Sequence, residues 1–195
     1  MKDPNRLIRK RLRVKPYDSL PFTGWHKATR QDLAEIMAEM GYKTGAEIGV
    51  AQGTFSEVLC QTIPNLHLMC VDPWQAYDRI SQELCDRRYE LAVERLSHYN
   101  TTIIRKSSLE AAREIPDESL DFIYIDGAHD FDNVMIDLIL WARKVRKGGI
   151  VSGHDYFHFY QSGVCRAVDA YTVAHGVTQW YITKEKEASW FWVKK

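Results

Sequence analysis

The sequence predicts an α/β fold built on a doubly wound, mostly parallel sheet of seven strands, the last two forming a C-terminal antiparallel hairpin. Apolar strand-like segments alternate with amphipathic helical segments along most of the chain, which is typical of a parallel sheet covered by helices on both faces. Near the end, two aromatic segments flank the polar run KEKE, which indicates the hairpin. The length of 195 residues and a charged fraction of 27% fit one globular domain.

The helices are predicted from apolar spacing and from their boundary residues. Residues 30–40 carry apolar side chains at i, i+3, i+4 and i+7, the pattern of an amphipathic helix. Thr54 and Glu57 fit a capping box at the start of a helix over 54–62. Further helices are expected at 78–98, 108–113, 131–146 and 163–175.

The strands are predicted from short apolar or β-branched runs bounded by glycine, proline or polar residues. Each of the first five ends in residues that a parallel sheet would present at its carboxyl edge. In chain order the seven strands are TGAEIGV, LHLMCV, TTIIR, LDFIYID, IVSG, VTQWYIT and ASWFWVK.

The expected domain covers residues 28–195 and follows a basic N-terminal arm, residues 1–27. Seven Lys or Arg and one Asp lie within residues 1–15, so a chain of zero formal charge has a basic arm and a mildly acidic body. The arm could contact nucleic acid, an anionic substrate or a partner subunit. Because its start has little apolar area, we expect a solvated segment that is dispensable for folding. Three of its aromatic residues could still pack on the domain: Tyr17, Phe22 and Trp25.

Several classes of protein do not fit the composition. No apolar run reaches the roughly 18 residues of a membrane span, and the first residues lack the apolar core of a secretory signal. The four cysteines form no CxxC pair, which argues against a zinc site or a disulfide framework. We therefore expect a cytoplasmic protein with no membrane partner.

A glycine loop follows the first strand and points to a nucleoside-type ligand. Gly49 and Gly53 would allow a tight turn and close approach of a ligand, and Asp72, at the end of the next strand, suits ribose hydroxyls. The spacing is neither GxGxxG nor a P-loop, which argues against a nicotinamide dehydrogenase. Glu47 would repel a pyrophosphate but suits a cationic ligand. The alternative is that the glycines only shape a turn.

A second polar cluster is expected where the fourth and fifth strands end. Asp126 and His129 follow one strand, and His154 and Asp155 follow the next. Because parallel strands bring their carboxyl ends to one edge, these groups could ligate a divalent metal or form a general-base pair. The alternative is that Asp126 and Asp155 cap the helices that follow them.

The segments AEIGVAQGTF, VDPW and DFIYIDGAH, with the hairpin, resemble the class I S-adenosylmethionine-dependent methyltransferases over roughly residues 28–195. The resemblance implies a Rossmann-like methyltransferase fold. It also implies that the glutamate–glycine loop holds the methionine part, that the acid after the second strand holds the ribose, and that the turn after the third strand holds the adenine. The implied cofactor contacts are Glu47, Gly49, Gly53, Asp72, Ser107, Ser108 and Asp126.

Within that family the chain resembles a metal-dependent branch, the tylosin- and novobiocin-pathway sugar O-methyltransferases and the cephalosporin-hydroxylase-type proteins. The resemblance is carried by the IDG turn and by His154-Asp155 before a tyrosine, where that branch has a pair of acids; Ala128 also stands where some members have a further acid. It implies metal ligation by Asp126, His154 and Asp155. His154 stands where an acid is usual, and imidazole favours Mn²⁺ or Fe²⁺ over Mg²⁺.

The expected activity is therefore S-adenosylmethionine-dependent O-methylation of a small-molecule or sugar hydroxyl, helped by Mg²⁺ or Mn²⁺. Asp126 and His129 are the candidate catalytic residues, with His129 as the base. Aromatic residues such as Trp74 and Tyr156 are expected to line an acceptor pocket, and nucleic acid is not the expected acceptor. Two alternatives stay open: a metal-independent methyltransferase with a histidine base, and a non-catalytic nucleoside-binding subunit. The apolar helix 131–146 also allows a homo-oligomer.

Overall fold

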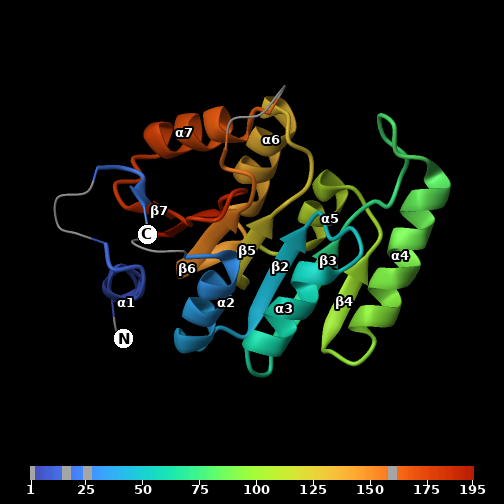
Figure 1. Cartoon of the computed structure of the whole chain (residues 1–195), viewed down its shortest axis with the longest axis horizontal. Helices are drawn as coiled ribbons and strands as arrows, with labels where there is room; N and C mark the ends of the chain where they lie inside the picture. The colour runs from blue at the N-terminus through green and yellow to red at the C-terminus, as the bar shows by residue number, and fades with distance from the viewer. Residues whose placement is uncertain (1–2, 15–18, 24–27, 158–161) are drawn as a thin grey trace.

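The fold is an eight-stranded sheet between two layers of helices (Figure 1). We describe it from a computed structural model over residues 3–14, 19–23, 28–157 and 162–195. The strands are β1 (Phe22–Thr23), β2 (Thr44–Ile48), β3 (His67–Val71), β4 (Thr101–Ile104), β5 (Leu120–Ile125), β6 (Val145–Gly153), β7 (Trp180–Ile182) and β8 (Trp190–Val193). The helices are α1 (Pro4–Arg11), α2 (Arg30–Glu39), α3 (Thr54–Thr62), α4 (Gln82–Leu96), α5 (Ser108–Glu114), α6 (Phe131–Trp141) and α7 (Val164–Ala174).

The strand order places the ligand-binding edge. The order is β1-β7-β8-β6-β5-β2-β3-β4, and all neighbouring pairs are parallel except those that involve β8. From β2 the chain first adds β3 and β4 on one side, and then returns to add β5 on the other. Such reversals leave a crevice at the carboxyl ends of the two central strands, here β2 and β5, where open α/β sheets bind ligands.

Two hydrophobic cores hold the layers together, one on each face of the sheet. Strand β5 shows the division, because Phe122 and Tyr124 enter one core while Ile123 and Ile125 enter the other. The first core takes buried side chains from α1, α2, α3 and α4, and the second takes them from α5, α6 and α7. Figure 1 shows α2, α3 and α4 beside one another over one face. The α/β layering and the closing hairpin predicted from the sequence are confirmed.

Three local predictions are wrong. The helix predicted over 78–98 begins only at Gln82, after its N-cap Ser81. The helix predicted over 131–146 ends at Trp141, because Val145 already pairs with Leu120 at the start of β6. The side chain of Thr54 caps nothing. The N-cap of α3 is Gly53, whose positive φ of 76° turns the chain into the helix without a side-chain hydrogen bond.

The N-terminal segment packs more closely than expected. Ile8 and Leu12 are buried in the first core, so the expectation of a solvated start is wrong for them. Phe22 belongs to β1, which pairs with β7 and raises the number of strands from seven to eight. Tyr17 and Trp25 lie outside the described residues. The division of the chain at residue 28 stays a prediction.

Two surface properties bear on partners. Ile136 and Ile139 on α6 are 45% and 49% exposed, so the predicted contact with a second subunit has an apolar surface available and stays a prediction. In the part of the chain that the structure describes, no helix is both long and apolar enough to cross a membrane.

Candidate active site

The loop between β2 and α3 is packed against the end of β5. Gly49 has a positive φ of 93°, and a Cβ placed there would lie 2.2 Å from the backbone oxygen of Asp126. The Asp126 amide in turn donates to the carbonyl of Ile48 at 2.7 Å. Only glycine fits at position 49, as the sequence predicts, but the close neighbour in this structure is the protein backbone itself.

Asp72 fastens the same loop to the end of β3. One carboxylate oxygen accepts from the amides of Val50 and Ala51 at 3.0 and 2.9 Å, and the other accepts from the amide of Trp74 at 2.8 Å. These three bonds orient the carboxylate at the carboxyl edge, where the ribose is predicted to bind. They also give Asp72 a structural role that the sequence did not indicate.

Glu47 lies beneath the loop and is 1% exposed. Its carboxyl accepts a hydrogen bond from the hydroxyl of Ser56. Burial raises the pKa of Glu47 to about 8, against the opposing effects of the Ser56 hydrogen bond and the nearby Arg30 charge. Near pH 7 the Glu47 carboxyl is therefore mostly protonated, and a bound cation would favour its ionised form.

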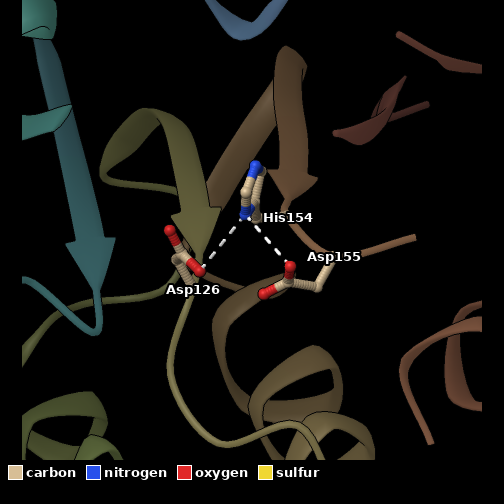
Figure 2. Close-up of side chains that lie close together, drawn as sticks. All are labelled: Asp126, His154 and Asp155. Atoms are coloured by element: carbon tan, nitrogen blue, oxygen red, sulfur yellow. Dashed lines mark ion pairs between the residues drawn. The ribbon is translucent and has the colours of Figure 1, made fainter. Parts of the chain in front are cut away.

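The second cluster converges as predicted, between the ends of β5 and β6. Figure 2 shows the imidazole of His154 between the carboxylates of Asp126 and Asp155. Nδ1 of His154 lies 3.6 Å from Oδ1 of Asp126 and 3.4 Å from Oδ1 of Asp155. One potential ligand atom from each of the three residues lies within 4.8 Å of the others. That spacing allows the three groups to share one divalent ion.

The charges of this cluster are strongly coupled. Burial lowers the pKa of His154, but the two carboxylates outweigh it and raise the value to about 9. Burial raises the pKa of Asp155, yet hydrogen bonds from His129 and His154 hold it well below its usual range. A protonated His154 imidazole therefore offsets one of the two carboxylate charges of the cluster.

His129 joins the cluster through Asp155. Its Nε2 lies 2.8 Å from Oδ2 of Asp155, and this hydrogen bond raises the pKa of His129. The alternative helix-capping role of the two acids is wrong, because α6 is capped by Asp130 and α7 begins after Gly163. Asp155 also has a positive φ of 59°, a strained backbone region that Asp and Asn adopt more readily than most residues.

The serines predicted to contact adenine are engaged within the protein. Ser107 is the N-cap of α5 and forms a capping box with Glu110. The hydroxyl of Ser108 donates to Asp137 and accepts from the indole of Trp141 at 2.7 Å. Their contact with adenine stays a prediction, and the structure gives both side chains structural partners.

Arg30 and Glu185 lie at the site although the sequence did not single them out. Nη1 of Arg30 lies 4.0 Å from Oδ2 of Asp126, and its guanidinium carbon lies over the ring of Phe55, 4.8 Å from the ring centroid. Glu185, from the turn before β8, accepts from the amide of Arg30 at 2.8 Å. Nothing in the local pattern around either residue indicates these contacts, which arise when the hairpin packs beside α2.

The chain has recognisable relatives. The family model described as a methyltransferase domain matches residues 46–156, more than half of the chain. A stretch of 115 residues is 28% identical to an uncharacterised protein of Sinorhizobium fredii; it includes 56% of this chain and 12% of that protein. The chain thus spans about an eighth of the length of the curated relative it matches.

Two solved structures are similar over the whole chain. One is an O-methyltransferase from Bacillus cereus in complex with SAH, with a TM-score of 0.63 and 13% identity over 100% of this chain and 91% of that one. The other is the O-methyltransferase TomG from Streptomyces achromogenes, involved in tomaymycin synthesis and solved with SAM; its TM-score is 0.61 at 13% identity and the same coverage. At this identity the likeness establishes the fold.

Proposed function

The chain belongs to the family of methyltransferase domains, and from that premise we propose that it methylates a hydroxyl oxygen of a small molecule or sugar. The methyl donor is S-adenosylmethionine, and a divalent metal at Asp126, His154 and Asp155 assists. The observation that carries the proposal is the convergence of these three side chains, with ligand atoms within 4.8 Å of one another, beside the glycine loop.

The donor set fits a divalent cation. Two carboxylates and one imidazole suit Mg²⁺ or Mn²⁺, and the imidazole favours the transition metal. The backbone of Asp155 is held in an unusual conformation that aims its carboxylate at the other two groups, which is typical of a functional site. A bound divalent ion would supply positive charge that stabilises the deprotonated acceptor oxygen.

The remaining side chains orient the reactants and manage the proton. His129 is the proposed base, and its hydrogen bond to Asp155 would stabilise the imidazolium that forms when the ring accepts the acceptor's proton. Asp72 and the glycine loop line the edge where the nucleoside would bind. The half-buried Tyr156 follows Asp155 in sequence, but its ring packs edge-on against Trp180 and its hydroxyl donates to Asp169, so the structure adds no support to its predicted place in the acceptor pocket.

The nucleoside part of the proposal can be tested on its own. Replacing Asp72 with Ala should weaken S-adenosylhomocysteine binding by ~1.5–3 kcal/mol, the range for hydrogen bonds to charged groups. Calorimetric titration measures this, and an unchanged affinity in a folded variant would remove Asp72 from the binding site.

A chelator experiment tests the metal. After exhaustive chelation the protein should still bind S-adenosylhomocysteine in a calorimeter but transfer no methyl group, and Mn²⁺ or Mg²⁺ should restore transfer. The transfer assay follows S-adenosylhomocysteine production over a panel of hydroxylated sugars and aromatic compounds. Full activity after chelation would instead favour a metal-independent enzyme with a histidine base.

The metal-independent alternative has one observation in its favour. His154, with its pKa raised to about 9, is itself a cation between the two acids near neutral pH. The non-catalytic alternative has a distinct signature: the protein would bind S-adenosylhomocysteine and yet transfer nothing with any metal or acceptor of the panel.

A further inference from the structure

The side chain of Arg30 lies beside the crevice, between α3 and the end of β5. Arg30 is the first residue of α2, and its side chain is 36% exposed. Its guanidinium lies over Phe55, in the first turn of α3, and approaches Asp126 no closer than 4.0 Å. A distance of 4.0 Å is too long for a hydrogen bond. Among the residues that the structure describes, no hydrogen bond to this guanidinium is present.

The location of this arginine is unusual on electrostatic grounds. The N-terminal end of a helix favours acidic side chains, because its unpaired amides and dipole are positive there. Arg30 occupies that end nonetheless, and its backbone is held by Glu185, whose carboxylate also accepts from the hydroxyls of Thr183 and Ser189. The hairpin therefore fixes the start of α2 so that the guanidinium lies at the crevice.

The surroundings indicate what this cation is for. The carboxylates of Asp72 and Asp126 make the crevice acidic, which suits the sulfonium and the ammonium of S-adenosylmethionine. The same ligand carries an α-carboxylate beside its ammonium, and acids alone would repel it. Arg105, on the β4 side, is already paired with Asp86 at 2.5 Å. Arg30 has donors to offer, and it lies next to the loop predicted to hold the methionine part.

We propose that Arg30 binds the α-carboxylate of the methionyl part of S-adenosylmethionine. This inference rests on the proposed function and adds a specificity contact to it. The planar guanidinium suits a carboxylate because it can donate two parallel hydrogen bonds. Contact with the ring of Phe55 limits the mobility of the guanidinium, and the first turn of α3 adds further positive potential on the same side.

The test compares two ligands that differ only in the carboxylate. Decarboxylated S-adenosylmethionine keeps the nucleoside, the sulfonium and the amine. By calorimetry, Arg30→Gln should weaken binding of S-adenosylmethionine by about ten- to a hundred-fold, the loss expected for a charged hydrogen-bonded pair. Its affinity for the decarboxylated compound should stay within about three-fold of the wild-type value, because that ligand has no group for Arg30 to bind.

Two further variants keep the test interpretable. Arg30→Lys, which retains the charge and loses the paired donors, should fall between the wild type and Arg30→Gln. Arg143→Gln removes an exposed arginine that pairs with Asp117 away from the crevice, so it should discriminate between the two ligands as the wild type does. Thermal melting of each variant checks that the protein is folded.

The outcomes separate this inference from the proposed function. If Arg30→Gln changes both affinities by the same factor, the guanidinium does not recognise the carboxylate and the inference is wrong. If Arg30→Gln does not fold, the affinities for the two ligands are compared in Arg30→Lys instead, and an equal change in both again contradicts the inference. If the wild type binds neither ligand, the proposed cofactor itself is wrong.

Discussion

Two buried aspartates near the carboxyl edge of the sheet have opposite electrostatic surroundings. Asp155 is 8% exposed and Asp137 is 6% exposed. Asp155 contacts the imidazoles of His129 and His154, and these hold its pKa well below the usual value despite burial. Asp137 contacts the hydroxyl of Ser108, and burial raises its pKa to about 6.

The contrast distinguishes Asp155, whose surroundings favour a charged carboxylate that can bind a cation, from Asp137, whose surroundings favour a neutral carboxyl. Burial alone disfavours a charged carboxylate in both places. Of the two, Asp155 contacts cationic groups that stabilise its charge, and it lies with Asp126 and His154 in a cluster compact enough to share an ion. The partners of a buried acid, more than its depth, indicate which of the two belongs to the active site.

The largest predicted effect is the loss of methyl transfer when the charge of Asp155 is removed. Asp155→Asn keeps the size of the side chain and tolerates the positive φ, but it removes the charge. We expect methyl transfer to fall by about a thousand-fold, ~4 kcal/mol in activation free energy, even with metal in excess. Asp137→Asn is the matched control, with equal burial and the same chemical change, and its transfer rate should stay within about two-fold. Equal losses in both variants would contradict the assignment.

The next effect concerns two glycines that flank these regions. Gly49→Ala would push a Cβ to 2.2 Å from the backbone oxygen of Asp126, at a φ of 93°. We expect a loss of ~4 kcal/mol in the free energy of unfolding, measured in urea. At Gly127 the nearest atoms to an added Cβ lie 3.8 Å away or farther, one of them on Asp137. Gly127→Ala should therefore change stability by less than ~1 kcal/mol, and a loss as large as that of Gly49→Ala would contradict this packing.

A third predicted effect is a dependence of stability on pH that comes from Asp137. Because the pKa of Asp137 is raised in the folded state, the folded protein holds this proton where the unfolded chain has released it. The protonated Asp137 carboxyl therefore contributes to the free energy of unfolding fully below about pH 4, and this contribution is lost as pH rises through about 6. Relative to the wild type, Asp137→Asn should gain ~2–3 kcal/mol in unfolding free energy between pH 4 and pH 7. Urea titrations across that range measure the difference, and a flat difference would mean that Asp137 is charged when folded.

The smallest effect concerns Ser108, for which the sequence and the structure suggest different roles. Ser108→Ala removes the partner of Asp137 and of the Trp141 indole, which should cost ~1–2 kcal/mol of stability. If the hydroxyl serves only this internal network, calorimetry should find S-adenosylhomocysteine affinity unchanged. A clear loss of affinity with intact stability would restore its predicted contact with adenine.

Much of the architecture could be predicted because periodicity and strand ends carry the information locally. The alternation of β5, the glycine loop and the two pairs after β5 and β6 are contiguous in sequence, and a parallel sheet brings strand ends together. The seven predicted strands are all present, and so is the convergence of Asp126, His154 and Asp155.

The features that local sequence patterns do not predict depend on contacts between distant segments of the chain. The hydrogen bond between Glu185 and the amide of Arg30 joins residues 155 positions apart, and no local pattern reveals it. The end of α6 was misjudged because pairing of Val145 with Leu120 overrides the helical periodicity of 131–146. Burial of Ile8 and Leu12 was missed because charge dominates the composition around them.

The two-residue strand β1 covers part of β7, which would otherwise be the edge strand of the sheet. It pairs with Tyr181 and Ile182 of β7, while Phe22 packs on the ring of Tyr181 at 5.6 Å and Arg9 lies over Phe22 at 5.1 Å. Without this cover, β7 would present unpaired backbone groups along an aromatic strand, the kind of edge on which a second chain adds in register. Because β1 covers part of this edge, we expect a chain shortened to residue 28 to expose β7 and to self-associate more readily than the full chain.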